Sequence, residues 1–190
     1  MAMCERVNQS TDLEVGLWAT SFSEGFGTVS WTTFVPDLTA LEAATDKLQV
    51  DDGYLQATDD GAALSVGGAD DALFEVVHGE PDPSADPQYV TAVRAVCASG
   101  GIANGMVLGV ELAQRAEAIT GLSTMFVRNL TGAYAGVGWL TGYPSIEALE
   151  AAQAALAADP GWVEMIDARA PGAYTDDAAM TQQTIYRKLA

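Results

Sequence analysis

The sequence predicts an α+β protein made of two tandem βαββαβ units, the first of which lacks its opening strand. Three observations lead to this prediction. The chain has 190 residues, 49 % of them hydrophobic and 18 % charged, a composition typical of a globular protein with a sizeable core. It contains an internal repeat. Within each copy, strand-like alternation gives way to helical spacing in the same order.

The repeat is clearest when the sequence is shifted by 108 positions. Residues 26–54 then align without a gap with residues 134–162, and 12 of the 29 aligned positions are identical. Shared composition does not explain so many identities, so the sequence indicates a duplication. Identical pairs at this shift, or at a shift of 109, include Trp31 and Trp139, Asp51 and Asp159, Arg6 and Arg115, and Thr11 and Thr120.

The second copy gives the element order most clearly. Valine-rich alternation predicts a strand over 88–98, and apolar residues at helical spacing predict a helix over 102–119 that ends at Thr120-Gly121. Two strands, 123–130 and 134–142, are joined through Thr131-Gly132. Ser145 is the expected N-cap of the next helix, which Asp159-Pro160-Gly161 ends. A shorter helix over 161–169 and a last strand over 182–189 complete the βαββαβ order of a ferredoxin-like unit.

The first copy follows the same plan from its middle onward. We expect a helix over 2–10, strands over 13–22 and 26–34, a helix over 37–50 and a strand over 73–78. The predicted domains are 1–78 and 88–190, joined by the proline-rich acidic linker 79–87. Two full copies would need 26 residues more than the chain has, about one strand and most of one helix. We therefore expect either a truncated start or a sheet completed by a partner chain.

The charge excludes one class of partner. With 26 acidic and 8 basic residues, the formal net charge is −18, and no Lys/Arg cluster is present to bind phosphates, so nucleic-acid binding is not expected. The charge is divided unequally between the copies. Residues 1–86 contain 17 acidic and 2 basic residues, whereas residues 87–190 contain 9 and 6. An anionic ligand is therefore expected on the second unit.

Neither a membrane segment nor a secretory leader is expected. No run of 18 apolar residues exists, and the first residues are acidic and lack an apolar core. Cys4 and Cys97 form no CxxC motif and have no basic neighbour in sequence, so they predict inert thiols and no disulfide framework. These features favour a cytoplasmic protein.

The segment 137–162 and its copy 29–54 resemble the dimeric α+β barrel superfamily. The shared features are a strand with an aromatic residue, a helix start of the type Y-P-S-hydrophobic-E-A, and a helix end of the type D-P-x-W. The resemblance implies an α+β barrel with antiparallel sheets, and a ligand site between them. The superfamily includes antibiotic-biosynthesis-type monooxygenases, haem-degrading enzymes, isomerases and proteins without an assigned role, so the resemblance implies a fold more than a reaction.

His78 is the only histidine and is a weak catalytic candidate. Imidazole could act as a general base or a haem ligand, but a solvent-facing residue before the linker is the favoured interpretation. One histidine rules out a multi-histidine metal site, and no carboxylate loop pattern for Mg²⁺ or Ca²⁺ is present. The glycine-bearing stretch 99–105 lacks the nucleotide-binding motifs, so no cofactor is expected.

Five residues are ligand-binding candidates: Trp31, Trp139, Arg94, Arg128 and Tyr186. The two tryptophans are equivalent by the repeat and would either frame an apolar cavity or pack in the core, which is the commoner outcome. Arginines 94, 128 and 187 lie in predicted strands and would form either internal salt bridges, the favoured interpretation, or an anion site. Acidic pairs such as Asp51-Asp52 and Asp59-Asp60 are interpreted as solvated turns.

Three function classes remain open. The first is a protein that binds a small apolar or aromatic molecule between its sheets. The second, from the family resemblance and the paired tryptophans, is a cofactor-independent monooxygenase or isomerase. The third is an assembly module, because a sheet that lacks a strand tends to pair with another chain. The partners left open are thus a small molecule and further copies of the chain; whether the protein is an enzyme is also open.

Overall fold

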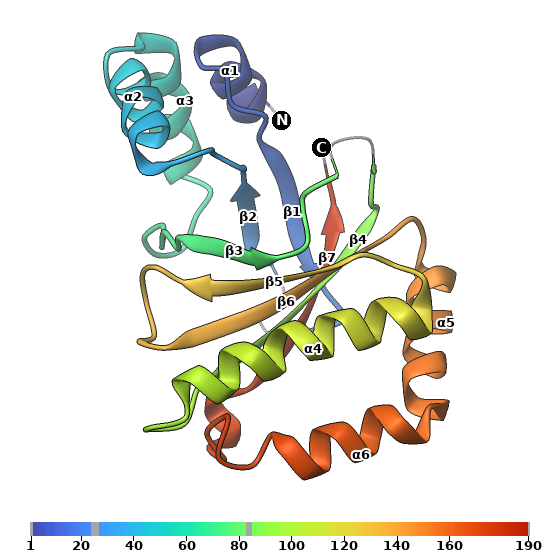
Figure 1. Cartoon of the computed structure of the whole chain (residues 1–190). Coiled ribbons are helices and arrows are strands. Elements are labelled where there is room, and N and C mark those ends of the chain that lie inside the picture. The colour runs from blue at the N-terminus through green and yellow to red at the C-terminus, as the bar shows by residue number, and fades with distance from the viewer. Residues whose placement is uncertain (1, 24–26, 83–84, 190) are drawn as a thin grey trace. The chain divides into compact units, whose positions relative to one another are not determined.

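The structure is a computed structural model that describes residues 2–23, 27–82 and 85–189 (Figure 1). The chain divides into two compact units. The first contains Met1–Thr20, Gly27–Asp70 and Lys188–Ala190, and the second contains Ser21–Phe26 and Asp71–Arg187. Both combine helices with antiparallel strands, so the predicted α+β class, of the α+β barrel type with antiparallel pairing, is confirmed. No described helix is long and apolar enough to cross a membrane.

The first unit contains one antiparallel strand pair and three helices in its described residues. Its elements are α1 (Ala2–Ser10), β1 (Gly16–Ser21), β2 (Val29–Thr32), α2 (Leu38–Gln49) and α3 (Asp52–Ala62). Strands β1 and β2 pair with Leu17 opposite Trp31. The predicted elements are thus present within a few residues.

The second unit is an antiparallel sheet with helices on one face (Figure 1). Five of its strands are hydrogen-bonded in the order β7-β4-β6-β5-β3. After β3, the βαββαβ order of a ferredoxin-like unit is complete, with α6 added before the last strand. The elements are β3 (Phe74–His78), β4 (Tyr89–Val96), α4 (Ile102–Thr120), β5 (Thr124–Asn129), β6 (Gly136–Tyr143), α5 (Ile146–Ala158), α6 (Pro160–Arg169), a 3-10 turn (Ala178–Met180) and β7 (Gln182–Lys188).

Local sequence explains where these helices begin and end. Ser145 Oγ accepts the amide of Ala148 at the start of α5, and Asp37 Oδ1 accepts the amide of Ala40 at the start of α2. Ser145 is the N-cap expected from the sequence, and Asp37 is its counterpart in the first copy at the shift of 108. At the end of α4, Gly121 has φ of 72°, the left-handed conformation that glycine adopts without strain.

Helix α3 was missed by the sequence prediction. The sequence predicts solvated turns at the pairs Asp51-Asp52 and Asp59-Asp60, but residues 52–62 form a helix. Asp51 is its N-cap and accepts the amide of Tyr54. The interior of α3 contains Gly53 and Gly61 and few apolar residues, so neither propensity nor periodicity indicates a helix there.

The first predicted domain, 1–78, ends with residues 74–78, which form strand β3 of the second unit. Strand β3, expected to close the first domain, pairs with β5, with Val76 opposite Val127. Residues 83–84 of the predicted linker 79–87 lie outside the described residues.

The core of the second unit lies between α4 and the sheet. Phe126 and Leu108 are fully buried, and Gly109 lets the ring of Phe126 approach the helix. A Cβ atom at Gly109 would lie 2.1 Å from Phe126 Cζ, a separation that no packed structure tolerates.

Candidate functional site

The second unit's sheet has one face against α4 and one face turned away from it. Trp139 Nε1 donates to the carbonyl of Gly109 in α4 at 2.8 Å, so Trp139 and the side chains that share its face point to the helix. The strand register shows which side chains point away from the helix. We call their surface the Arg94 face, and it contains Val90, Ala92, Arg94 and Val96 of β4, Gly138, Leu140 and Gly142 of β6, Met125 and Val127 of β5, and Gln182, Thr184 and Tyr186 of β7.

Arg94 is the one cation among these side chains, and it is exposed. Its cross-strand neighbours are Gly138 on β6 and Gln182 on β7, neither of which carries a charge. Among the described residues, none forms a hydrogen bond or ion pair with Arg94. An unpaired guanidinium among apolar side chains is suited to bind an anionic group of a ligand.

Tyr186 lies on the same face as Arg94 and is partly buried. It stands opposite Val90, four residues from Arg94 along β4, which corresponds to a separation of about 13 Å along the strand. The side chains between them are small or apolar, Ala92 and Thr184 among them. Arg94 and Tyr186 could therefore contact opposite ends of a flat ligand of several fused rings.

The two tryptophans lie in different surroundings. The ring of Trp139 is 5.2 Å from that of Phe126 and 5.6 Å from that of Tyr174, on the helix side of the sheet. This is the core alternative that the sequence left open, and it places Trp139 away from the Arg94 face. Trp31 is 51 % exposed on β2 of the first unit.

Arg128 and Arg187 do not join Arg94. Arg128 Nε donates to Glu75 Oε2 at 2.6 Å, and its register partner Val137 belongs to the core beneath α4. Arg187 lies opposite Tyr89 and is exposed. The internal salt bridge favoured for these arginines is thus formed by Arg128, whereas Arg94 remains available for a ligand.

His78 lies on the helix side of the sheet. Its Nε2 is 3.7 Å from Glu117 Oε2 of α4 and has no hydrogen-bond partner among the described residues. The other oxygen, Glu117 Oε1, accepts the amide of Thr124 at 3.0 Å. This position is separated from Arg94 by the sheet, so His78 is not placed to act on a ligand bound there.

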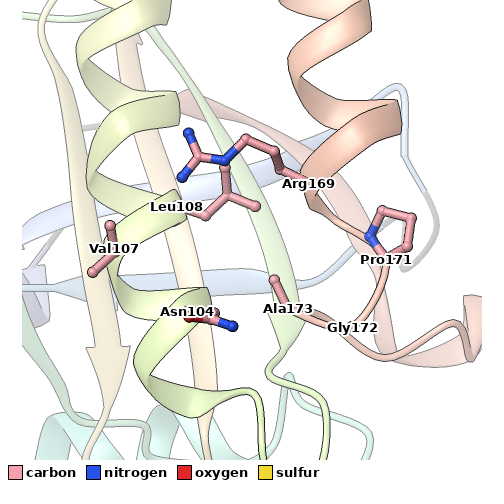
Figure 2. Close-up of a pocket in the computed structure, with 7 residues that line it drawn as sticks. All are labelled: Asn104, Val107, Leu108, Arg169, Pro171, Gly172 and Ala173. Carbon is pink, nitrogen blue, oxygen red and sulfur yellow. The ribbon is translucent and has the colours of Figure 1, made fainter.

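A separate pocket of about 430 Å³ lies between α4 and the loop after α6, and its lining residues are drawn in Figure 2. Arg169 at its wall is ion-paired with Glu111, so the guanidinium charge is already neutralised. Val107, one of its lining residues, is 57 % exposed. It contains none of the residues predicted from the sequence: its lining is Asn104, Val107, Leu108, Arg169, Pro171, Gly172 and Ala173.

Neither a metal nor a reactive thiol is indicated in the described part of the chain. No group of three His, Cys, Asp or Glu residues there could hold a metal ion. Burial raises the pKa of the Cys97 thiol, which keeps it protonated and unreactive near neutral pH. The Arg94 face offers one guanidinium, one phenol, the amide of Gln182, the hydroxyl of Thr184 and apolar side chains.

The glycines of β6 are a feature that the sequence reasoning missed. Residues 136, 138 and 142 are all glycine and alternate with Val137, Trp139 and Tyr143, a pattern visible in the sequence. A Cβ atom at Gly138 would lie 3.2 Å from Val93 O and 3.4 Å from a methyl of Val127. Gly138 therefore leaves Arg94 without a side-chain neighbour on β6.

The solved structures that resemble this chain include three that align with nearly its whole length. One from Fusobacterium nucleatum, described as a "putative monooxygenase", has a TM-score of 0.68 at 7 % identity, with 100 % of this chain and 82 % of that chain covered. One from Lactobacillus acidophilus with the same description has a TM-score of 0.58 at 8 % identity, with 98 % of this chain and 82 % of that chain covered. An anthrone oxidase-like protein has a TM-score of 0.63 at 15 % identity, with 99 % and 82 % covered.

These likenesses show the fold alone. It is a fold that this chain shares with monooxygenase-like proteins. No family model matches the sequence, and no curated protein matches it. At such low identity, the neighbours' activities are not transferred residue by residue.

Proposed function

We propose that this protein binds a small aromatic molecule with an ionisable hydroxyl group on the Arg94 face and oxidises it with molecular oxygen, without a bound cofactor. The observation that carries the proposal is the exposed, unpaired guanidinium of Arg94 on a largely apolar sheet face. The fold shared with monooxygenase-like proteins, one of them anthrone oxidase-like, supports the reaction type.

The reaction needs no external reductant when the substrate itself supplies the electrons. A ring methylene that lies across the ring from a carbonyl and is conjugated with it through the flanking aromatic rings, as in anthrone, loses a proton to solvent water and becomes an electron-rich enolate. With one molecule of O₂, the CH₂ group becomes C=O and one molecule of water is released. The substrate loses four electrons, O₂ accepts them, and both of its oxygen atoms are accounted for.

In this scheme Arg94 acts on the charge of the substrate. A guanidinium beside an oxyanion favours the ionised form, so it would lower the pKa of the bound enol and raise the fraction that reacts with oxygen. The surrounding apolar side chains, Val90, Leu140 and Met125, would exclude water and strengthen the interaction. Tyr186 would contact the far end of the ring system.

The test is oxygen uptake and anthraquinone formation from anthrone by the purified protein and by variants. Arg94→Ala should lower kcat/KM about 10- to 100-fold, because a hydrogen bond to a charged group contributes on the order of 1.5–3 kcal/mol. Arg94→Lys should recover part of the loss. Arg187→Ala is the matched control, since it removes an exposed strand arginine from the other face, and it should change kcat/KM less than about twofold.

Two outcomes would contradict this proposal in different ways. Equal oxygen uptake by wild type and Arg94→Ala would remove Arg94 from the site. Tight binding of anthrone that Arg94→Ala weakens, without oxygen uptake above the blank, would show that the protein binds the ligand and would contradict the proposed oxidation.

A further inference from the structure

Strand β3 forms one edge of the second unit's sheet in the described structure (Figure 1). It pairs with β5 on one side, and no described residue of this unit pairs with it on the other. Three of its five residues are exposed apolar side chains: Phe74 is 41 % exposed, Val76 37 % and Val77 39 %. An edge with free backbone groups and exposed apolar side chains is a template for an additional strand.

The hydrogen bonds to β5 define which backbone groups are free. The amide of Leu130 donates to the carbonyl of Leu73 at 2.8 Å, so residue 73 directs its polar groups toward β5. Alternate residues of an antiparallel strand point their amides and carbonyls in opposite directions. Phe74 and Val76 therefore present their backbone N–H and C=O groups to the free edge.

The internal repeat indicates what this edge is built to pair with. Strand β3 follows α2 and α3, just as β7 follows α5 and α6, so the two strands are counterparts. Strand β7 pairs antiparallel with β4 over six residue pairs, from Tyr89 opposite Arg187 to Arg94 opposite Gln182. The described chain has no counterpart of β4 in its first copy, and β3 lacks the neighbour that β7 has.

Charge decides between a second copy of the chain and a different partner. Exposed acidic residues flank β3 on both sides, with Asp71 before it and Glu80 after it. Antiparallel pairing of β3 with β3 of a second copy would bring Asp71 of one chain near Glu80 of the other, which is repulsive. A strand flanked by Lys or Arg would instead be attracted at both ends.

We propose that the free edge of β3 binds an extended segment of a partner protein, with apolar residues at alternate positions and basic residues on both flanks. Backbone hydrogen bonds to Phe74 and Val76 would provide affinity, and their side chains would contact the alternate apolar residues. The basic flanks would select the partner by charge. The backbone pairing at this edge does not depend on Arg94 or on the proposed reaction.

The test uses the whole protein and a fluorescein-labelled peptide with the β4 sequence QYVTAVRAV and lysines added at both ends. Fluorescence anisotropy should show binding that weakens as salt is added. The same peptide with glutamates in place of the lysines should bind at least about tenfold more weakly. Hydrogen exchange should slow in residues 73–78 when the Lys-flanked peptide is present, because their free amides become hydrogen-bonded.

A pair of variants at one position tests the backbone contact. Val76→Pro removes the amide on the free edge but none directed at β5, so it should abolish peptide binding in a folded protein. Val76→Thr keeps the amide and should bind within about threefold of wild type. Circular dichroism checks the fold of both variants.

Three results would overturn this proposal. The first is equal binding of the Lys- and Glu-flanked peptides. The second is protection of residues outside 73–78 with none inside. The third is a wild-type dimer in sedimentation that Val76→Pro dissociates, since this would show that the β3 edge pairs with a second copy of the chain.

Discussion

Arg115 on α4 and Asp159 at the N-cap of α6 form an ion pair, with Nη2 2.7 Å from Oδ1. The same aspartate accepts the amide of Trp162 and so caps the helix. Arg6 and Asp51 repeat the arrangement in the first unit, where Nη2 lies 2.6 Å from Oδ1 and Asp51 caps α3. One carboxylate thus joins two helices in each unit by serving both a guanidinium and a helix start.

Other contacts recur at the same spacing. Thr11 Oγ1 donates to Val7 O and accepts the amide of Leu13, and Thr120 Oγ1 donates to Ala116 O and accepts the amide of Leu122. In both units the hydroxyl ends the first helix in the same way. Such shared contacts are what the duplication predicted from the sequence would produce.

Variants at Asp159 should separate its two roles. Asp159→Ala removes the helix cap and the ion pair, Asp159→Asn keeps a capping oxygen but loses the charge, and Arg115→Ala removes only the ion pair. Asp159→Ala should therefore lower the urea midpoint of unfolding most, and the other two variants less. Urea titration followed by circular dichroism measures this order. If Asp159→Asn were as unstable as Asp159→Ala, the ion pair rather than the cap would be the main contribution.

The same aspartates predict how stability depends on pH. Arg115 lowers the pKa of Asp159 below its ordinary value of 3.8, and the Arg6 guanidinium lowers that of Asp51. A carboxylate with a lowered pKa in the folded state contributes stability that is complete above the ordinary value and is lost as pH falls toward the folded pKa. Wild type should therefore lose stability below about pH 4 more steeply than Asp159→Asn. Urea midpoints at pH 7 and pH 3 compare the two slopes; parallel slopes would contradict the prediction.

Much of the fold could be predicted because short local patterns in the sequence define individual helices and strands. Valine alternation in β4, apolar spacing in α4 and the Pro144-Ser145 helix start each specify one element without reference to the rest of the chain. Helix α3 could not be predicted, because its N-cap Asp51 is held by hydrogen bonds from Arg6 and Ser10 of the preceding segment. These contacts join residues more than 40 positions apart and leave no periodic pattern in the sequence.

The candidate site was less predictable than the fold. Alternation shows which side chains share a face, but it does not say which face the helices cover. The face that α4 covers is identified by Gly109, which leaves room for the ring of Phe126 and whose carbonyl accepts the indole N–H of Trp139. Once the helix side is known, Arg94 and Tyr186 fall on one surface and Arg128 on the other. The alternating glycines of β6 were visible in the sequence and could have indicated that surface.

Trp139 offers a test that distinguishes core from ligand contact. Trp139→Ala should destabilise the protein by about 3–5 kcal/mol, because it removes a large side chain packed against Phe126 and Tyr174. Trp139→Phe should cost less, since the ring contacts partly remain, and should leave anthrone turnover per folded molecule unchanged. Urea unfolding and oxygen uptake measure the two properties. Loss of turnover in a stable Trp139→Phe variant would return Trp139 to the ligand site.

Gly109 should tolerate no side chain. In Gly109→Ala the new methyl would lie 2.1–2.7 Å from three ring atoms of Phe126, which is fully buried and cannot move into solvent. The helix must shift away from the sheet, so we expect the free energy of unfolding to fall by about 1–3 kcal/mol or more, although alanine favours helices over glycine by about 1 kcal/mol.

Asn104→Ala, at an exposed position of the same helix, is the control and should be neutral or slightly stabilising. The double variant Gly109→Ala/Phe126→Leu should recover part of the loss, because the smaller side chain makes room for the methyl. Unfolding free energies from urea titration test all three variants, and a stabilised Gly109→Ala protein would contradict the close contact between α4 and β5.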